Sequence, residues 1–175
     1  MKQMVFAVSG VKNSGKTTMV ERLVTEFIRR GYSVATIKHD AHHFDADVPG
    51  RDSYRHRAAG AYGTAVFDEE KYMLIKNGQQ TIEGLITQFP EADMVILEGA
   101  KQTGWPKIEV VRAGNSEKSV CDASTLIALA TNLPLVAPGI PVEDIDDIAT
   151  LADLTLAYFE KNKNVENGKK WLLNK

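Results

Sequence analysis

The sequence has little cysteine, no long apolar run and no excess of positive charge, and each absence excludes a class of protein. Cys121 is the only cysteine among the 175 residues, which rules out a disulfide framework and a cysteine-rich zinc module. No apolar run approaches the roughly 20 residues that a membrane helix needs. Lys and Arg number 21 against 23 Asp and Glu, a formal charge of −2, so a nucleic-acid binder that works through bulk positive charge is also excluded.

The remaining composition is that of an ordinary globular protein with a hydrophobic core. Hydrophobic residues make up 43% of the chain and charged residues 25%, close to the averages for globular domains. The apolar N-terminal stretch ends at Ser9-Gly10 and is too short for a signal peptide. We therefore expect a cytoplasmic protein with no nucleic-acid or membrane partner, in which residues 1–160 form a single domain and residues 161–175 form a polar C-terminal tail.

Short apolar runs alternate with helical patterns, which predicts an α/β fold with a mostly parallel sheet. The expected strands are Met4–Val8, Ser33–Ile37, Met94–Leu97, Lys107–Arg112 and Leu126–Ala130, with a pair of shorter strands at Thr64–Phe67 and Tyr72–Ile75. The expected helices are Lys16–Arg30, Thr81–Phe89 and Ile145–Phe159, and a short helix capped by Asp52 or Ser53 and running through Ala59. The compact run Met4–Val8 is typical of a central strand buried on both faces.

A phosphate-binding motif follows the first strand directly. Residues 10–17 read Gly-Val-Lys-Asn-Ser-Gly-Lys-Thr, which fits Gly-x-x-x-x-Gly-Lys-Thr between a strand and an amphipathic helix. Gly10 and Gly15 permit the backbone angles that turn successive N–H groups toward a phosphate. The helix that begins at Lys16 adds unpaired N–H donors and a favourable dipole. Lys16 is predicted to contact the terminal phosphates and Thr17 to bind Mg²⁺. Together with the α/β pattern, the motif predicts a P-loop NTPase-type three-layer sandwich, with residues 1–160 as its nucleotide-binding domain.

A magnesium site also requires a carboxylate. In a parallel sheet the ligand lies beyond the carboxyl ends of the strands, where Glu98 ends the strand that Met94 begins and Gly99 permits close approach. Asp93 precedes the same strand, which places it roughly 16 Å away at the other edge, at about 3.3 Å per residue. Glu98 is therefore the predicted metal ligand or water-positioning acid.

All four histidines, His39, His42, His43 and His56, lie in or just beyond a polar loop at residues 39–52. Three interpretations stay open: a substrate or switch loop, a hydrated surface loop, and a transition-metal site. In the first, Lys38 and arginines such as Arg51 bind phosphate while Asp40 helps to hold the metal or the water.

The chain resembles the molybdopterin-guanine dinucleotide biosynthesis adapter family, usually called MobB, over nearly its whole length. The resemblance rests on residues 10–18, 37–40, 43–47, 49–53, 58–61, 96–99 and 144–147. The phosphate-binding motif is shared by a large superfamily, whereas Lys38-His39-Asp40 and Pro49-Gly50-Arg51-Asp52-Ser53 narrow the resemblance to this family.

The resemblance implies a homodimer that binds GTP, hydrolyses it weakly, and assists the guanylyltransferase that joins GMP to molybdopterin. Molybdopterin or its guanine dinucleotide is a second implied ligand. The hypothesis assigns catalytic roles to Lys16, Glu98 and Asp40 and magnesium binding to Thr17 and Glu98. The hypothesis assigns nucleotide binding to Gly10, Asn13, Ser14, Gly15, Lys16, Thr17, Thr18, Lys38 and Arg51.

The sequence departs from related patterns at two points. Val11 stands where the deviant motif of dimeric ATPases has a lysine, and Asn-Lys-x-Asp, the guanine-recognition motif, is missing. Guanine preference therefore rests on the resemblance, with Thr131-Asn132 as a weak candidate for base contact. A small-molecule kinase with arginines that bind an acceptor phosphate, and a non-catalytic pterin- or metal-binding module, are the alternative functions.

Overall fold

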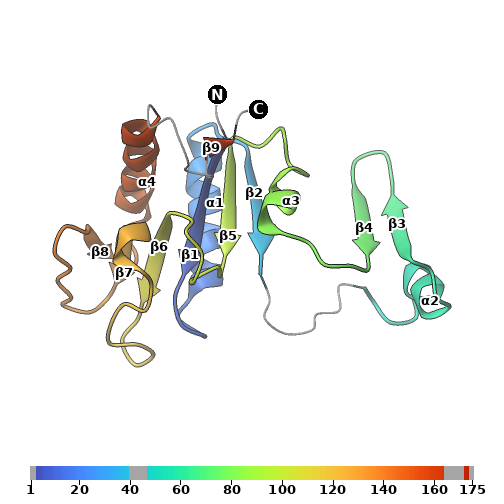
Figure 1. The fold of residues 1–175 in the computed structure, drawn as a ribbon, viewed down its shortest axis with the longest axis horizontal. Coiled ribbons are helices and arrows are strands. Elements are labelled where there is room, and N and C mark those ends of the chain that lie inside the picture. The colour runs from blue at the N-terminus through green and yellow to red at the C-terminus, as the bar shows by residue number, and fades with distance from the viewer. Residues whose placement is uncertain (1–2, 40–46, 164–171, 174–175) are drawn as a thin grey trace. The chain divides into compact units, whose positions relative to one another are not determined.

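The computed structural model describes residues 3–39, 47–163 and 172–173. The chain divides into two compact units, one formed by Met1–His39 with Leu85–Lys175 and the other by Asp40–Gly84. The first unit holds a large sheet with two long helices, and the second holds a short helix and a two-stranded hairpin (Figure 1). The prediction of one nucleotide-binding domain over residues 1–160 stays a prediction.

The sheet of the first unit contains six parallel strands in the order β2-β5-β1-β6-β7-β8. Their bounds are β1 (Gln3–Ser9), β2 (Val34–Lys38), β5 (Met94–Glu98), β6 (Lys107–Val111), β7 (Leu126–Thr131) and β8 (Val142–Asp144). β9 (Leu172–Leu173) adds an antiparallel pair to the first residues of β1. Because β1 has strands on both sides and covered faces, it is apolar along almost its whole length, as predicted for a central parallel strand.

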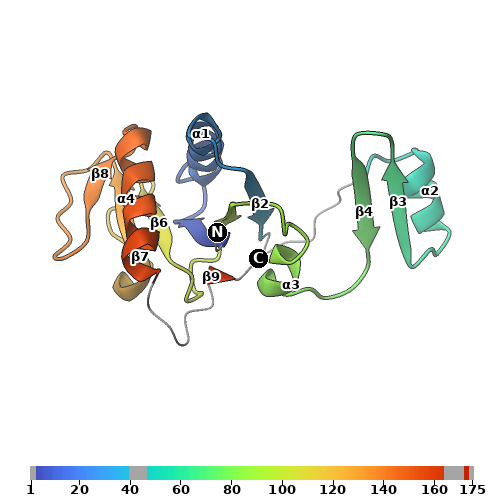
Figure 2. The same cartoon turned by 90° about the horizontal axis from the view of Figure 1, so that it is seen from above.

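Two helices, α1 (Lys16–Arg29) and α4 (Ile148–Asn162), pack against each other and against one face of the sheet. Leu23 and Phe27 of α1 and Leu151 of α4 are fully buried in the core that they share with Phe6 of β1. The Phe6 and Phe27 rings meet edge to face, with centroids 6.0 Å apart, a preferred arrangement for aromatic pairs. The predicted fold, helices flanking a parallel sheet, is confirmed (Figure 2).

The opposite face of β6 carries two fully buried charged residues, Lys107 and Glu109. The Lys107 ammonium group donates to the carbonyl oxygens of Lys101, at 3.3 Å, and Thr103, at 2.6 Å. Burial lowers the pKa of Lys107. The Glu109 carboxylate accepts a hydrogen bond from the Val120 N–H at 2.7 Å. These bonds fix two turns over the sheet and satisfy the buried charges, which would otherwise be costly.

The second unit consists of α2 (Asp52–Ala58) and the antiparallel strands β3 (Gly63–Phe67) and β4 (Tyr72–Lys76). The buried Asp47 carboxylate accepts from the Ser53 hydroxyl at 2.9 Å and pairs with Arg57 at 3.4 Å. This carboxylate therefore anchors the start of α2.

The bounds predicted from the sequence agree with those of most helices and strands to within one or two residues. Several other predicted elements differ from the structure. The helix expected over residues 81–89 is only α3 (Ile82–Ile86). The last helix begins at Ile148, because the Asp147 carboxylate accepts from the Thr150 N–H and caps it. Neither Asp52 nor Ser53 caps α2, since Arg51 precedes its first residue. The strands β8 and β9 and the 3₁₀ turn η1 (Ala123–Thr125) were not predicted. The structure describes only residues 161–163 and 172–173 of the predicted tail.

No helix in the described ranges is long and apolar enough to cross a membrane.

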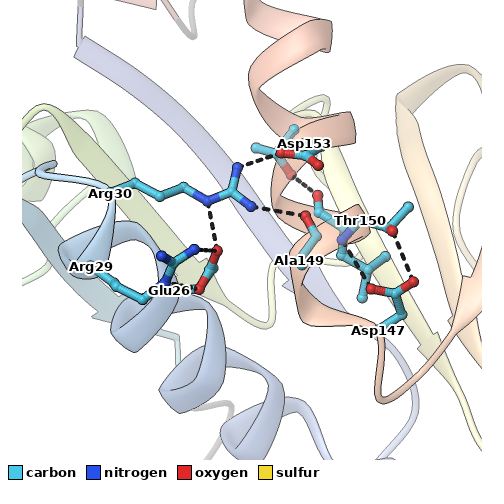
Figure 3. Close-up of polar contacts among 9 residues, drawn as sticks. Glu26, Arg29, Arg30, Asp147, Ala149, Thr150 and Asp153 are labelled. Carbon is cyan, nitrogen blue, oxygen red and sulfur yellow. Dashed lines mark hydrogen bonds and ion pairs between the residues drawn. The ribbon is translucent and has the colours of Figure 1, made fainter.

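An arginine connects the two long helices at their surface (Figure 3). The Arg30 guanidinium group donates to the Glu26 carboxylate of α1 at 2.7 Å, to the Asp153 carboxylate, and to the Ala149 carbonyl at 3.1 Å. Arg29 adds two further bonds to Glu26 at 2.8 Å. Hydrogen bonds from both arginines lower the pKa of Glu26 from its ordinary value of 4.5 to about 2.

Because the pKa of Glu26 is lower in the folded chain, the network stabilises the fold fully above about pH 4.5, and this stabilisation is lost as the pH falls toward 2. We predict that Glu26→Gln has a smaller loss of stability between pH 5 and pH 2.5 than the parent chain, measured by urea denaturation. Glu21→Gln, an exposed position on the same helix, is the control and should follow the parent. Parallel pH profiles for all three chains would contradict the prediction.

Candidate functional site

The loop at residues 10–17 joins the buried end of β1 to the start of α1. Its backbone requires glycine most strictly at Gly10. Gly10 has φ +142°, and a Cβ there would lie 2.5 Å from the Val110 carbonyl oxygen on the neighbouring strand. Gly15, directly before α1, has φ +95°, and Asn13 also has a positive φ of 62°. The loop therefore reverses tightly against β6, as the motif predicts.

Two side chains that follow β6 hold the loop from outside. The Arg112 guanidinium group donates through Nε to the Ser14 carbonyl at 3.2 Å. The Asn115 amide donates to the Lys12 carbonyl at 3.0 Å. Because these carbonyl oxygens are bonded away from the loop interior, they do not repel an anion placed inside it.

Several main-chain N–H groups of the loop lack an acceptor among the residues that the structure describes. They belong to Asn13, Gly15, Lys16 and Thr17. The Ser14 hydroxyl is fully buried and has no hydrogen-bond partner within the described part of the chain either. Unpaired donors at the N-terminus of a helix are the usual binding site for a phosphate group.

Lysines dominate the electrostatics of the loop. The Lys16 ammonium group, half-buried, donates to the Val11 carbonyl at 2.7 Å. Burial lowers the pKa of Lys16, and the charges of Lys101 and Lys38 lower it further, while Glu98 acts in the opposite direction. Among the described residues, two further ammonium groups and one carboxylate thus act on the Lys16 ammonium group, an arrangement that an anionic ligand would stabilise.

The carboxylate lies where the sheet topology predicts. Glu98 ends β5, directly beside Val8 of β1 on one side and Lys38 of β2 on the other. Its side chain is only 12% exposed, pairs with the Lys38 ammonium group at 3.3 Å, and accepts from the Thr17 hydroxyl at 2.8 Å. The structure therefore brings together four of the predicted residues: Lys16, Thr17, Lys38 and Glu98. Asp93, before the same strand, bonds instead to Ser33.

The remaining predicted residues fall into three groups. Asn13 and Thr18 belong to the loop and the first turn of α1, and both are exposed. Arg51 lies in the second unit. Asp40, His42 and His43 lie outside the described residues, and with them most of the histidine loop. Among residues 3–39, 47–163 and 172–173, no group of His, Cys, Asp and Glu side chains is arranged to hold a metal ion.

Sequence reasoning missed Arg112, Asn115 and Lys101. Arg112 and Asn115 lie about 100 residues from the loop that they bond, and no local pattern marks them. Lys101 had a usable signal, because it lies three residues beyond Glu98, at the edge of the sheet where the ligand is expected.

The fold and the loop define a P-loop protein, with the Gly-x-x-x-x-Gly-Lys-Thr loop between the central strand and its helix and an acidic residue at the end of the adjacent strand. The family model described as "Molybdopterin guanine dinucleotide synthesis protein B" (MobB) matches residues 5–132. The chain belongs to this MobB family.

Curated relatives and solved structures agree with this assignment. An Escherichia coli molybdopterin-guanine dinucleotide biosynthesis adapter protein is 31% identical over 166 residues, covering 90% of this chain and 94% of the relative. A Haemophilus influenzae protein of the same name is also 31% identical, with 85% of each chain covered. The crystal structure of Bacillus subtilis MobB has a TM-score of 0.74 at 29% identity, covering 88% of this chain and 96% of that one.

We predict that Gly10→Ala lowers the free energy of unfolding by about 1–3 kcal/mol more than Gly139→Ala, because only the first would force a Cβ against backbone. Gly139 also has a positive φ, of +76°, but has open space around it, so its substitution carries only the cost of the left-handed backbone, about 1–2 kcal/mol. Urea denaturation of both variants measures the difference. Equal losses would show that the contact between Gly10 and β6 is not tight.

Proposed function

We propose that this chain is a Mg²⁺-dependent GTP-binding protein with slow GTPase activity that acts as an adapter in molybdopterin guanine dinucleotide biosynthesis. The observation that carries the proposal is the loop at residues 10–17, whose unpaired N–H groups and lysine suit a phosphate. The family assignment supports the pathway, and the loop supports the nucleotide.

The triphosphate would bind the unpaired N–H groups of the loop and replace one contact that the loop makes with itself. The N–H groups of Asn13, Gly15 and Thr17 would donate to phosphate oxygens, together with the dipole of α1. The Lys16 ammonium group would exchange the Val11 carbonyl for the terminal phosphates. Lys38 has its ammonium group 3.3 Å from the Glu98 carboxylate and would add charge on the same side.

Thr17 and Glu98 are suited to hold Mg²⁺. A hydroxyl and a carboxylate oxygen lie 2.8 Å apart at the edge of the loop, and hard oxygen ligands of this kind are what Mg²⁺ prefers. The bound ion would supply positive charge to the phosphate oxygens. Glu98 lies at the end of a buried strand, which supports a fixed position for its carboxylate beside the loop.

Hydrolysis is expected to be slow. Phosphoryl transfer depends mostly on positioning and on charge stabilisation, and an arginine that contacts the transferred group adds a large rate factor. Arg112 approaches the loop, but its Nε bonds the Ser14 carbonyl. Lys16 and Glu98 would supply the charge and orientation, and the sequence-based roles of Asp40 and Arg51 remain part of the proposal. Such a site binds nucleotide more effectively than it hydrolyses it.

The adapter role follows from the relatives. The Escherichia coli and Haemophilus influenzae relatives are named as adapter proteins of molybdopterin-guanine dinucleotide biosynthesis. We infer that this chain meets the guanylyltransferase that joins GMP to molybdopterin, with molybdopterin or its guanine dinucleotide as the shared ligand. A cytoplasmic location belongs to the same proposal.

We predict that Lys16→Ala weakens GTP binding in the presence of Mg²⁺ by roughly 10- to 100-fold, the usual effect of losing charged hydrogen bonds. Isothermal titration calorimetry measures the change. Lys12→Ala removes the same charge from an exposed position of the same loop and should bind within a few-fold of the parent. Unchanged affinity in Lys16→Ala would remove the basis of the proposal.

The hairpin of the second unit supports the proposed homodimer. Phe67 at 82%, Tyr72 at 74% and Leu74 at 60% are exposed, and both strands have a free edge within the described residues. Isolated two-stranded hairpins are marginally stable, and contiguous exposed apolar side chains typically mark an interface. A second copy of the chain that covers this hairpin would bury the apolar side chains of both.

We predict that Phe67→Ser with Leu74→Ser converts the dimer to a monomer at micromolar concentration, measured by light scattering. Val136→Ser changes another highly exposed apolar residue, in the first unit, and should leave the dimer intact. A parent chain that is monomeric, or a double variant that stays dimeric, would contradict the proposed interface.

A further inference from the structure

A shallow pocket of about 390 Å³ lies at the carboxyl end of β7 and along the short edge strand β8. Its lining is of two kinds. Leu133, Leu135 and Val142 supply apolar surface, while Asn132, Glu143 and Asp144 supply an amide and two carboxylates. The site described above does not use this pocket.

The pocket lies on the same edge of the sheet as the phosphate-binding loop. β7 is two strands from β1, which corresponds to about 10 Å at the usual strand spacing. The segment that follows β6 connects the two places: the Ala113 N–H donates to the Asn132 side chain at 2.8 Å, and the adjacent Arg112 donates to Ser14 of the loop. A ligand with its phosphates on the loop can therefore extend across β6 to the pocket.

Asp144 is the better placed of the two carboxylates. It lies at the end of β8, beside Thr131 of β7. One oxygen accepts from the Asp146 N–H at 2.7 Å, which fixes the orientation of the carboxylate. The other oxygen has no hydrogen-bond partner among the described residues. The Asn132 carbonyl oxygen is bonded to Ala113, which fixes the orientation of the amide, and its N–H₂ group has no acceptor within the described part of the chain.

This combination distinguishes guanine from adenine. Guanine presents two adjacent donors, N1–H and the exocyclic amino group, which a carboxylate accepts together, and it presents acceptors at O6 and N7. Adenine has an acceptor at N1, which a carboxylate repels. The apolar side chains provide contact for the faces of either ring.

We propose that the pocket binds the guanine ring of the nucleotide, with Asp144 accepting from N1–H and the amino group and Asn132 donating to O6 or N7. The proposal rests on the proposed function, because it assumes that the phosphates occupy the loop at residues 10–17. It gives the chain a guanine-recognition site in the absence of the Asn-Lys-x-Asp motif.

The test is a calorimetric panel of GTP, ATP, xanthosine triphosphate and inorganic tripolyphosphate, with Mg²⁺ and the full chain. The parent chain should bind GTP at least tenfold more tightly than ATP. Asp144→Asn should weaken GTP binding by about tenfold or more and strengthen xanthosine triphosphate binding, because an amide N–H₂ can donate to the C2 carbonyl of xanthine. Tripolyphosphate should bind both chains equally. Glu143→Gln, on the other pocket carboxylate, is the matched control and should keep the preference of the parent.

Failure of this proposal differs from failure of the proposed function. If the parent chain binds tripolyphosphate and all the nucleotides equally, the proposed guanine site is wrong and the phosphate site stays supported. This outcome can be measured on the parent chain alone. A shift of preference in Glu143→Gln, or an Asp144→Asn chain that weakens tripolyphosphate as much as GTP, would also overturn the role of Asp144. A parent chain that binds none of the four ligands would overturn the proposed function and the pocket together.

Discussion

The main-chain N–H groups of the loop at residues 10–17 can face one ligand only because the carbonyl oxygens between them are bonded elsewhere. Arg112 and Asn115 hold two of these oxygens, those of Ser14 and Lys12, from the segment after β6. The close contact of Gly10 with β6 fixes where the turn begins. The geometry of the site is therefore a property of two neighbouring strands, β1 and β6, rather than of the loop sequence alone.

The order of the strands then distributes the functional groups along one edge. β5 and β2, on one side of β1, bring Glu98 and Lys38 together at the edge where the loop at residues 10–17 lies. β7 and β8, on the other side, present the amide and carboxylate of the pocket. A nucleotide placed along this edge would meet charge and metal ligands at one end and base-recognition groups at the other. Under the proposed function, this division would provide the groups that nucleotide binding needs and few that would accelerate hydrolysis.

The sequence predicted what depends on local patterns. The motif at residues 10–17, the central strand and the two long helices each have a periodicity or spacing of their own, and Glu98 followed from the parallel topology. Arg112 and Asn115 could not be found in this way, because their role depends on a contact between segments about 100 residues apart. β8 has three residues and follows a proline, too short a run for a strand pattern. The roles of Asp40 and Arg51 and the interpretation of the histidine loop stay predictions.

The central claim is that the loop between β1 and α1 binds the phosphates of a guanine nucleotide. A crystal structure of the chain with a non-hydrolysable GTP analogue and Mg²⁺ tests it most directly. The account predicts phosphate oxygens within hydrogen-bond distance of the N–H groups of Gly15, Lys16 and Thr17, with the ion beside Thr17 and Glu98. A nucleotide bound elsewhere, with this loop unchanged and unoccupied, would contradict the account.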